Sequence, residues 1–315
     1  MKKVKKNEFT ELQHLLSIKE MDVALINEIF SSADKFLRNN KSINKYDILE
    51  GKTVCNLFFE NSTRTQTTFE IAAKRLSADV INLDIATSSQ SKGESILDLI
   101  NNLIAMSVNI FVVRHSKPGI PELIAHNIKN NAHVINAGDG NKEHPTQALL
   151  DAYTIRSFKK EFSGLKVAIV GDIEHSRVAK SEIYILNKLG TKEVRVIGPE
   201  SLMPKSIKEL NVKIFNNMEE GLLDVDAVLM LRIQKERMRK NTIPSEKEYF
   251  KSFGLTKDRL KQAKKDCLVL HPGPINRGVE IDSLVADGDQ SVILEQVKNG
   301  IAIRMAVMEK MINSF

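Results

Sequence analysis

Short runs of β-branched and other apolar residues alternate with segments of helical periodicity along most of this chain. Four such runs in the first half predict strands, at Thr53–Phe59, Val80–Leu83, Val108–Arg114 and Val134–Ala137. Five more follow Pro145, at Lys166–Gly171, Glu193–Ile197, Val212–Phe215, Ala227–Leu231 and Cys267–His271. Strands that alternate with helices form βαβ units and parallel sheets. The pattern therefore predicts an α/β protein of two doubly wound domains, each a mostly parallel sheet flanked by helices.

The junction between the two predicted sheets, Pro145–Phe158, contains no Gly or Pro after its first residue. Because it lacks the composition of a flexible linker, we expect a connecting helix there. The last segment predicts an amphipathic helix, because its apolar residues recur every three or four positions, at Leu294, Val297, Ile301, Met305, Met308 and Ile312. The stretch Asn241–Lys251 has the weakest pattern of the second half, and we expect it to be a loop.

Composition narrows the possible classes of protein. The 315 residues, 42% of them hydrophobic and 27% charged, suit a folded protein of two domains and exclude a disordered chain. The net charge of +6 includes four lysines within the first six residues, so the body of the chain is close to balanced. This distribution favours a solvated basic terminus over a nucleic-acid-binding arm, and the remaining excess suits anionic substrates.

No stretch of the chain approaches the 18 consecutive apolar residues of a membrane span, and no apolar core follows the charged amino terminus. We therefore expect neither a transmembrane helix nor a secretory signal, and a cytoplasmic location. Cys55 and Cys267 both lie inside apolar, strand-like runs. They predict buried thiols rather than a disulfide framework or a zinc site.

The first candidate site is Ser62-Thr63-Arg64-Thr65, which follows a predicted strand directly and opens a helical pattern. The backbone N–H groups and the positive dipole of a helix amino terminus converge on anions placed there. The hydroxyls add donors, and Arg64 adds a bidentate fork suited to phosphate oxygens. A plain structural cap by Ser62 is the alternative. The arginine at the same point favours an anion site.

The second candidate site is the stretch Asn136–Gln147, where Gly138 and Gly140 predict a loop before a helix. His144 and Gln147 are three residues apart and share one face of that helix. This arrangement favours binding of a polar carbonyl or amide over a purely structural histidine. Neither a second histidine nor a carboxylate stands at metal-ligand spacing, so we expect no metal.

The third candidate site lies at the carboxyl ends of strands in the second half. Arg232 and Gln234 are alternate residues after a predicted strand, so they point the same way. Arg177 follows another strand of the same predicted sheet, and two arginines at one edge suit a dicarboxylate. The turn His271-Pro272-Gly273-Pro274 ends the last strand at the same crevice.

These motifs together resemble the aspartate and ornithine carbamoyltransferase family. The likeness is carried, in order and spacing, by Phe58-Phe59-Glu60-Asn61-Ser62-Thr63-Arg64-Thr65, His144-Pro145-Thr146-Gln147, Arg232-Ile233-Gln234 and His271-Pro272-Gly273-Pro274. It spans about residues 10 to 312. The Arg-x-Gln motif and the Pro-Gly-Pro turn favour the aspartate branch, because the cysteine-containing turn and acidic motif typical of ornithine enzymes do not occur.

The resemblance implies a role for each motif residue. Carbamoyl phosphate would be held by Ser62, Thr63, Arg64, Thr65, Arg114, His144 and Gln147, of which Arg64, Thr65, Arg114 and His144 would be catalytic. Aspartate would be held by Arg177, Arg232 and Gln234, with Ser88 and Lys92 inserted from a neighbouring chain, and the backbone of Pro272, Gly273 and Pro274 would face the ligands. Glu60 and Arg237 would form an interdomain pair.

The resemblance further implies carbamoyl transfer to the α-amine of L-aspartate, the committed step of pyrimidine biosynthesis, by a homotrimer, alone or in a larger assembly. Residues 1–150 would bind carbamoyl phosphate and 151–291 aspartate, with helix 292–315 returning to the first domain. Neither cofactor nor metal is expected. The alternatives are a sister enzyme acting on ornithine, a nicotinamide dehydrogenase and a nucleic-acid binder. A dehydrogenase is disfavoured because Val170-Gly171-Asp172 lacks the remaining glycines of the dinucleotide-binding motif. A nucleic-acid binder is suggested by the pI of about 9.1, but it is disfavoured because the chain has no Trp and only four Tyr.

Overall fold

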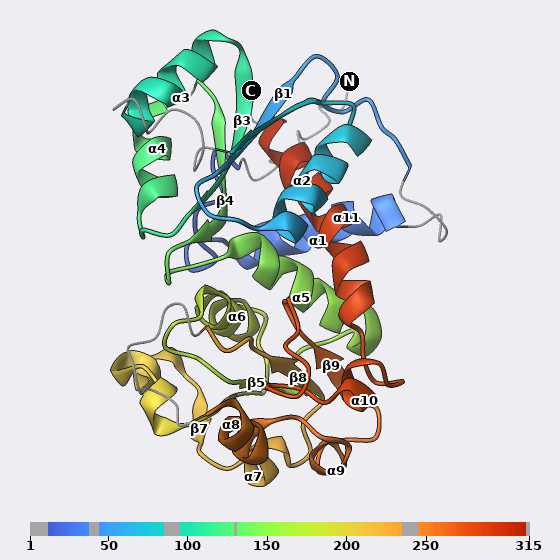
Figure 1. Cartoon of the computed structure of the whole chain (residues 1–315). Helices are drawn as coiled ribbons and strands as arrows, with labels where there is room; N and C mark the ends of the chain where they lie inside the picture. The colour runs from blue at the N-terminus through green and yellow to red at the C-terminus, as the bar shows by residue number, and fades with distance from the viewer. Residues whose placement is uncertain (1–11, 38–43, 85–94, 129–130, 235–244, 313–315) are drawn as a thin grey trace.

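The computed structural model describes residues 12–37, 44–84, 95–128, 131–234 and 245–312, which form two parallel sheets, one above the other in Figure 1. The first sheet has four strands in the order β2-β1-β3-β4. These strands are β1 (Thr53–Phe58), β2 (Asp79–Asp84), β3 (Val108–His115) and β4 (His133–Asp139). All three pairings are parallel. The helices of this part are α1 (Val23–Leu37), α2 (Thr63–Arg75), α3 (Ile96–Ala105) and α4 (Ile120–Ile128).

Both faces of the first sheet are covered, as the unbroken apolar runs of its strands require. Along β1, Val54 and Phe58 face the core formed with α1 and α2. Cys55 and Leu57 face the opposite core formed with α3 and α4. The thiol of Cys55 is therefore buried, as is that of Cys267, and both cysteines are free.

The second sheet has five parallel strands in the order β7-β6-β5-β8-β9. They are β5 (Lys166–Val170), β6 (Glu193–Ile197), β7 (Lys213–Phe215), β8 (Ala227–Met230) and β9 (Leu268–Leu270). Their flanking helices are α6 (Arg177–Lys188), α7 (Met218–Leu222), α8 (Glu246–Phe253), α9 (Lys257–Leu260) and α10 (Ser283–Ala286), with 3₁₀ turns at Glu200–Leu202 and Lys205–Leu210. The predicted two-sheet α/β fold is thus confirmed.

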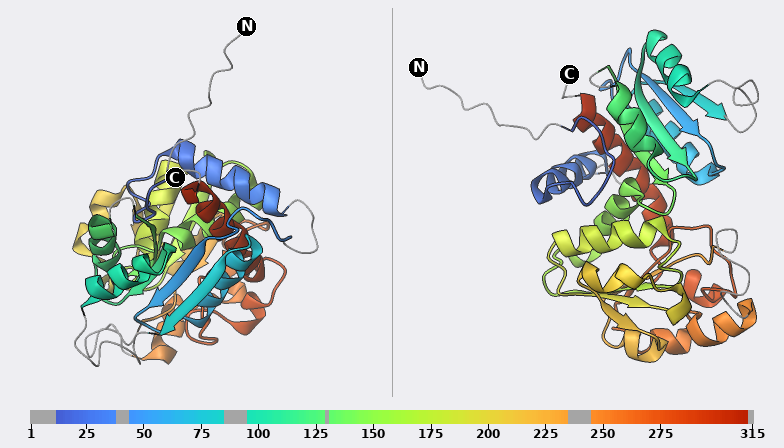
Figure 2. Two further views of the ribbon diagram at one scale, coloured as in Figure 1. Left: turned by 90° about the horizontal axis from the view of Figure 1, so that it is seen from above. Right: turned by 90° about the vertical axis from the view of Figure 1, so that its left-hand side faces the viewer.

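Two long helices join the sheets. Helix α5 (Pro145–Lys159) leads from β4 to β5, and its first eleven residues are all buried. Helix α11 (Ile293–Ile312) follows the second sheet in sequence and runs back along the first, where it packs against α1, α2 and α5 (Figures 1 and 2). The connecting helix and the returning carboxyl-terminal helix are both confirmed.

The topology places a switch point in each sheet. Chain order reverses between β1 and β3 in the first sheet and between β5 and β8 in the second. Ligands of open parallel sheets bind at the carboxyl ends of such strands. The segments that leave β1, β3, β5 and β8 carry the first and third candidate sites, so the fold brings these sites toward each other.

The loop expected at Asn241–Lys251 is largely a helix in the part that the structure describes. From the range Asn241–Lys251 the structure describes residues 245 onward, and α8 begins at Glu246. Ser245 caps this helix: its hydroxyl oxygen accepts from the Glu248 backbone N–H at 3.1 Å and donates to the Glu248 carboxylate at 2.8 Å. Buried Tyr249 and its neighbour Phe253, with ring centres 5.7 Å apart, anchor the helix to the domain.

The predicted apolar face of α11 is wrong at its start. Leu294 is 82% exposed and Val297 is 42% exposed, whereas every residue from 302 to 308 is buried. Two polar residues of this helix, Gln296 and Arg304, are buried at 2% and 3% exposure. At its start the helix turns Leu294 and Val297 to solvent and buries the side that carries Gln296, whereas from 302 to 308 it is enclosed by its neighbours, which include α1, α2 and α5. Among the described residues, no helix combines the length and hydropathy that crossing a membrane requires.

Candidate active site

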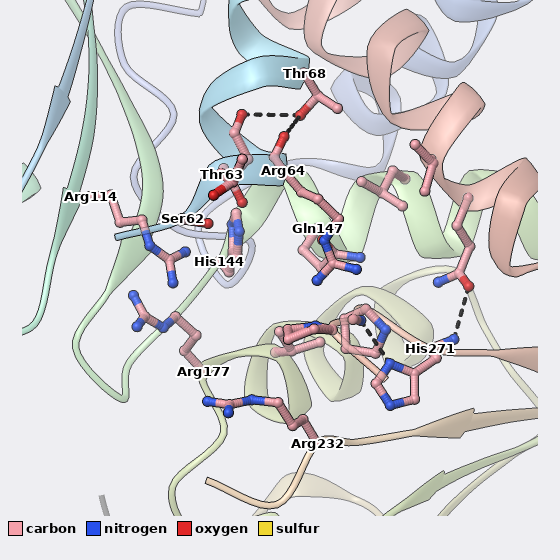
Figure 3. A pocket seen from close by; sticks show the side chains of 18 of the residues that line it. Ser62, Thr63, Arg64, Thr68, Arg114, His144, Gln147, Arg177, Arg232 and His271 are labelled. Atoms are coloured by element: carbon pink, nitrogen blue, oxygen red, sulfur yellow. Dashed lines mark hydrogen bonds between the residues drawn. The ribbon is translucent and has the colours of Figure 1, made fainter. Parts of the chain in front are cut away.

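The segment after β1 leads to the amino terminus of α2, where Ser62 occupies the N-cap position. Its backbone is extended at φ −157° and ψ 80°, and its side chain makes no capping hydrogen bond. A side-chain cap by Ser62, the alternative reading of this motif, is therefore absent, and anion binding at this turn stays a prediction. Thr63, Arg64 and Thr65 form the first helical turn, with backbone N–H groups that have no partner within a helix at these positions. This turn presents donors to the space below it in Figure 3.

The Arg64 side chain extends from this turn toward the turn that follows β9 in the second sheet. Burial lowers the pKa of its guanidinium, and the nearby charge of Arg232 lowers it further. Gly273, in the turn after β9, has φ +66° and lies so close that a Cβ there would stand 1.6 Å from an Arg64 guanidinium nitrogen. Glycine is needed at this position both for its backbone conformation and for this contact.

Arg114 and Arg177 approach each other from the two sheets, at the end of β3 and the start of α6 (Figure 3). Both contact one oxygen of Glu60, Arg114 at 2.9 Å and Arg177 at 2.5 Å. A Cβ on Gly138 would stand 2.5 Å from Arg177 and 2.8 Å from Arg114, so this glycine leaves room for both guanidinium groups. Burial and the Arg177 charge lower the pKa of Arg114 to about 10, against the opposing effect of Glu60, so it stays charged.

His144 lies at the N-cap of α5 beneath the α2 turn, and its side chain is buried. Burial lowers the pKa of the imidazole well below its ordinary value, and the charges of Arg114, Arg177 and Arg304 lower it further. His144 is therefore neutral at physiological pH. Its Nδ1 has no hydrogen-bond partner among the described residues.

A single cavity of about 640 Å³ joins these groups. Thirteen predicted site residues line it: Ser62, Thr63, Arg64, Thr65, Arg114, His144, Gln147, Arg177, Arg232, Gln234, Pro272, Gly273 and Pro274. In Figure 3, Arg177 points toward Arg114, and Arg232 lies below it, on the side of the cavity opposite Arg64, His144 and Gln147. The remaining two predicted residues, Ser88 and Lys92, lie outside the described residues, as does Arg237 of the expected pair with Glu60.

The lining of this cavity is strongly cationic. Its described residues include five arginines and one carboxylate, Glu60. That carboxylate is already engaged by two of the arginines. A ligand with several negative charges would suit this excess of arginines over carboxylates. Among the described residues, no group of three or more His, Cys, Asp or Glu side chains is arranged to hold a metal ion.

The lining residues that sequence reasoning missed include Gln296 and Arg304, both on α11. The Arg304 guanidinium carbon lies 4.8 Å from the centre of the Phe69 ring, and its Nη1 donates to the Gly300 carbonyl at 3.0 Å. Burial lowers its pKa to about 10. The signal available in the sequence was the presence of these two polar residues within the apolar repeat of the last helix.

The comparisons with known proteins agree with this geometry. Residues 13–157 match the model of the carbamoyl-P binding domain of aspartate/ornithine carbamoyltransferases, and residues 163–311 match the model of the Asp/Orn binding domain. Together the matches cover most of the chain. It therefore belongs to the aspartate/ornithine carbamoyltransferase family.

Solved structures of the family are similar throughout. Aspartate transcarbamoylase from Trypanosoma cruzi in complex with carbamoyl aspartate and phosphate is 28% identical, with a TM-score of 0.85 over 95% of each chain. The same enzyme with carbamoyl phosphate and aspartate is 27% identical, with a TM-score of 0.84 over 95% of this chain and 96% of that one. Ornithine carbamoyltransferase from Thermus thermophilus, 24% identical over 96% of this chain and all 100% of its own, shares the fold with a TM-score of 0.85.

Proposed function

We propose that this carbamoyltransferase moves the carbamoyl group of carbamoyl phosphate to the α-amine of L-aspartate, giving N-carbamoyl-L-aspartate and phosphate. One observation carries the choice of amine. Arg177 and Arg232, from the second sheet, face a cavity whose described lining has a single carboxylate, Glu60, already paired with arginines. Two arginines suit the two carboxylates of aspartate. Aspartate transcarbamoylase from Trypanosoma cruzi, 27% identical in its two complexes with aspartate, supports the same choice.

Ornithine is the competing amine, because the family includes enzymes that use it. Its side chain carries a positive charge, which an acidic group in the pocket would have to meet. The described lining offers only the Glu60 carboxylate for that purpose, and Arg114 and Arg177 occupy it. The charge balance of the cavity therefore favours aspartate.

The proposed reaction needs no nucleophilic side chain. The amine nitrogen of aspartate attacks the carbamoyl carbon, a tetrahedral oxyanion forms, and the bond to the phosphate oxygen breaks. Arg64, with the first turn of α2, holds the phosphate, while Thr65, Arg114 and neutral His144 donate to the oxyanion. The departing phosphate accepts the amine proton. Gln147 and the backbone near Pro272 and Gly273 take the amide of the carbamoyl group.

We further propose that residues 1–150 bind carbamoyl phosphate and 151–291 bind aspartate. The enzyme would act as a homotrimer in the cytoplasm at the committed step of pyrimidine biosynthesis, alone or in a larger assembly. Ser88 and Lys92 of a neighbouring chain would complete each site. A closed head-to-tail ring provides such sharing, because each site then draws on two chains.

Initial rates with a panel of amines test the proposed reaction. Phosphate release from carbamoyl phosphate is measured with L-aspartate, L-glutamate and L-ornithine, and succinate is tested as an inhibitor because it has both carboxylates but no amine. We expect turnover with aspartate and competitive inhibition by succinate. Turnover with ornithine at a rate equal to or above that with aspartate would contradict the proposal.

Subunit mixing tests the shared site separately. Lys92→Ala and His144→Ala should each be nearly inactive as pure proteins. After random reassociation of equal amounts, about one quarter of sites combine an intact loop with an intact pocket, if the site is shared. A mixture that stays inactive despite proven subunit exchange would place Lys92 in its own chain's site.

A further inference from the structure

A buried carboxylate that no step above uses lies directly behind the cavity. Asp151 is on α5, one helical turn after Gln147, and is 1% exposed. Its two oxygens accept from the Gln147 side-chain amide nitrogen at 3.0 and 3.1 Å. One of these oxygens also accepts from the Gln296 amide nitrogen at 2.6 Å. Asp151 thus contacts two glutamines that line the cavity.

The second of these glutamines continues the chain of hydrogen bonds to the turn after β9. The Gln296 side-chain oxygen accepts from the backbone N–H of His271 at 2.9 Å. The His271 ring in turn accepts from the backbone N–H of Gly273 at 2.7 Å. Asp151 is therefore linked to the side chain of Gln147 and to the backbone of the Pro-Gly-Pro turn. These are the two elements to which the proposed function assigns the carbamoyl amide.

An ionised carboxylate only accepts hydrogen bonds, so it determines which end of a neighbouring carboxamide faces it. Asp151 draws the nitrogen of Gln147 toward itself and leaves the Gln147 oxygen as the atom turned to the cavity. An acceptor at that place matches the N–H groups of a carbamoyl amide. If the Gln147 amide were turned the other way, its N–H groups would face the N–H groups of the carbamoyl amide, and two donors cannot form a hydrogen bond.

Glu182, on α6, keeps Asp151 in the accepting form. It is 1% exposed and faces Asp151, and burial together with the Asp151 charge raises its pKa well above the ordinary value. Burial raises the pKa of Asp151 to about 6, against hydrogen bonds from Glu182, Gln296 and Gln147 and the charge of Arg304. When the pair holds one proton, that proton is on Glu182, which donates to the Asp151 carboxylate.

We propose that Asp151 is a positioning residue for recognition of the carbamoyl amide, holding Gln147 directly and the His271–Gly273 backbone through Gln296. This inference rests on the proposed function. On this inference, Asp151 determines how strongly the site prefers a ligand with an amide group on the carbonyl carbon over one with a methyl group of the same size. Acetyl phosphate is the matched probe, because it keeps the phosphate and carbonyl and replaces the amide with a methyl group.

The test is calorimetric binding of carbamoyl phosphate and acetyl phosphate to the full chain and its variants. Gln147 donates to both Asp151 oxygens, so in Asp151→Asn the new amide nitrogen replaces one of its two acceptors and disfavours this orientation of Gln147. We expect the preference for carbamoyl phosphate to fall about tenfold or more, the loss typical of a hydrogen bond made to a mispaired group. Acetyl phosphate affinity should stay within about twofold, because the phosphate site is untouched.

Three further variants separate positioning from a general structural role. Glu182→Gln still donates to Asp151, so it should keep the preference. Gln296→Met breaks only the branch to His271 and should lower the preference several-fold. In a Gln147→Ala background, the effect of Asp151→Asn should shrink at least threefold, since the group it orients is gone.

An unchanged preference in both Asp151→Asn and Gln296→Met would overturn the inference. Additive effects of Asp151→Asn and Gln147→Ala would overturn it too, as would an equal loss in Glu182→Gln and Asp151→Asn. Wild-type protein that neither binds carbamoyl phosphate nor turns it over would instead refute the proposed function. Wild-type turnover with an unchanged preference in the variants refutes the positioning role alone.

Discussion

Replacing Gly273 by alanine would place a methyl group against the guanidinium that we assign to the phosphate. A Cβ at this position stands 1.6 Å from the nearest Arg64 nitrogen and 2.3 Å from its central carbon. The atoms in the way are the far end of a flexible side chain, so Arg64 moves while the backbone stays. To reach normal van der Waals separation it must retreat by about 2 Å.

The expected magnitude follows from two separate effects. The alanine must adopt φ near +66°, which costs about 1–2 kcal/mol of folding stability. Catalysis suffers far more, because a misplacement of about 1 Å in a positioned group costs on the order of a hundredfold in rate. We therefore expect kcat/KM for carbamoyl phosphate to fall about a hundredfold or more, while the protein remains folded.

Gly278→Ala is the matched control in the same connection. Gly278 has φ +77°, so alanine there carries a similar backbone cost, but nothing lies within 4 Å of the added methyl group. Steady-state kinetics and thermal melts of both variants give the comparison. Similar melting temperatures with a large loss of kcat/KM only in Gly273→Ala are predicted. Activity of Gly273→Ala within about threefold of that of Gly278→Ala would refute the placement of Arg64 at the reacting phosphate.

Three other predictions concern charge and protonation. Arg64→Ala should lower kcat/KM at least about a hundredfold with little change in melting temperature; activity within a few-fold of wild type would rule out the phosphate role. The imidazole of His144 should titrate well below the ordinary histidine range, because burial and its cationic neighbours lower its pKa, and ring ¹⁵N shifts titrating near 6.5 would contradict this. The free energy of unfolding should fall as pH drops from about 6.5 toward 4, since burial lowers the pKa of His14 to about 4 and also lowers that of His133. The unfolded chain then binds more protons, and the Val134 N–H that donates to His14 loses its acceptor; replacing His14 by Gln should flatten this part of the denaturation profile.

The strands and the phosphate motif were predictable because local signals and the fold agree. Continuous apolar runs such as Val108–Arg114 are buried on both faces of a parallel sheet, so the strands stand out from the sequence. Ser62 to Thr65 follow a strand and open a helix, and that order alone places them at the amino terminus of α2. Convergence of Arg177 with Arg114 on Glu60 depends instead on how the two sheets face each other, which no local pattern encodes.

Misses arose where tertiary contacts outweigh local pattern. Gln296 and Arg304 are buried polar residues on a helix surrounded by other helices, so periodicity could not show which side faces the cavity. Helix α8 depends on a cap by Ser245 and on the burial of Tyr249, and neither gives a strong repeat in the sequence. Asp151 has no motif of its own; its importance follows only from the partners that the fold brings to it.

The proposed reaction is tested most directly by identifying its product under competition. ¹³C-labelled carbamoyl phosphate is offered to the enzyme with equimolar L-aspartate and L-ornithine, and the labelled products are followed by NMR. The cationic cavity, with Arg177 and Arg232 at the amine side, predicts that N-carbamoyl-L-aspartate forms almost alone. Label accumulating mainly on the side-chain nitrogen of ornithine would contradict it.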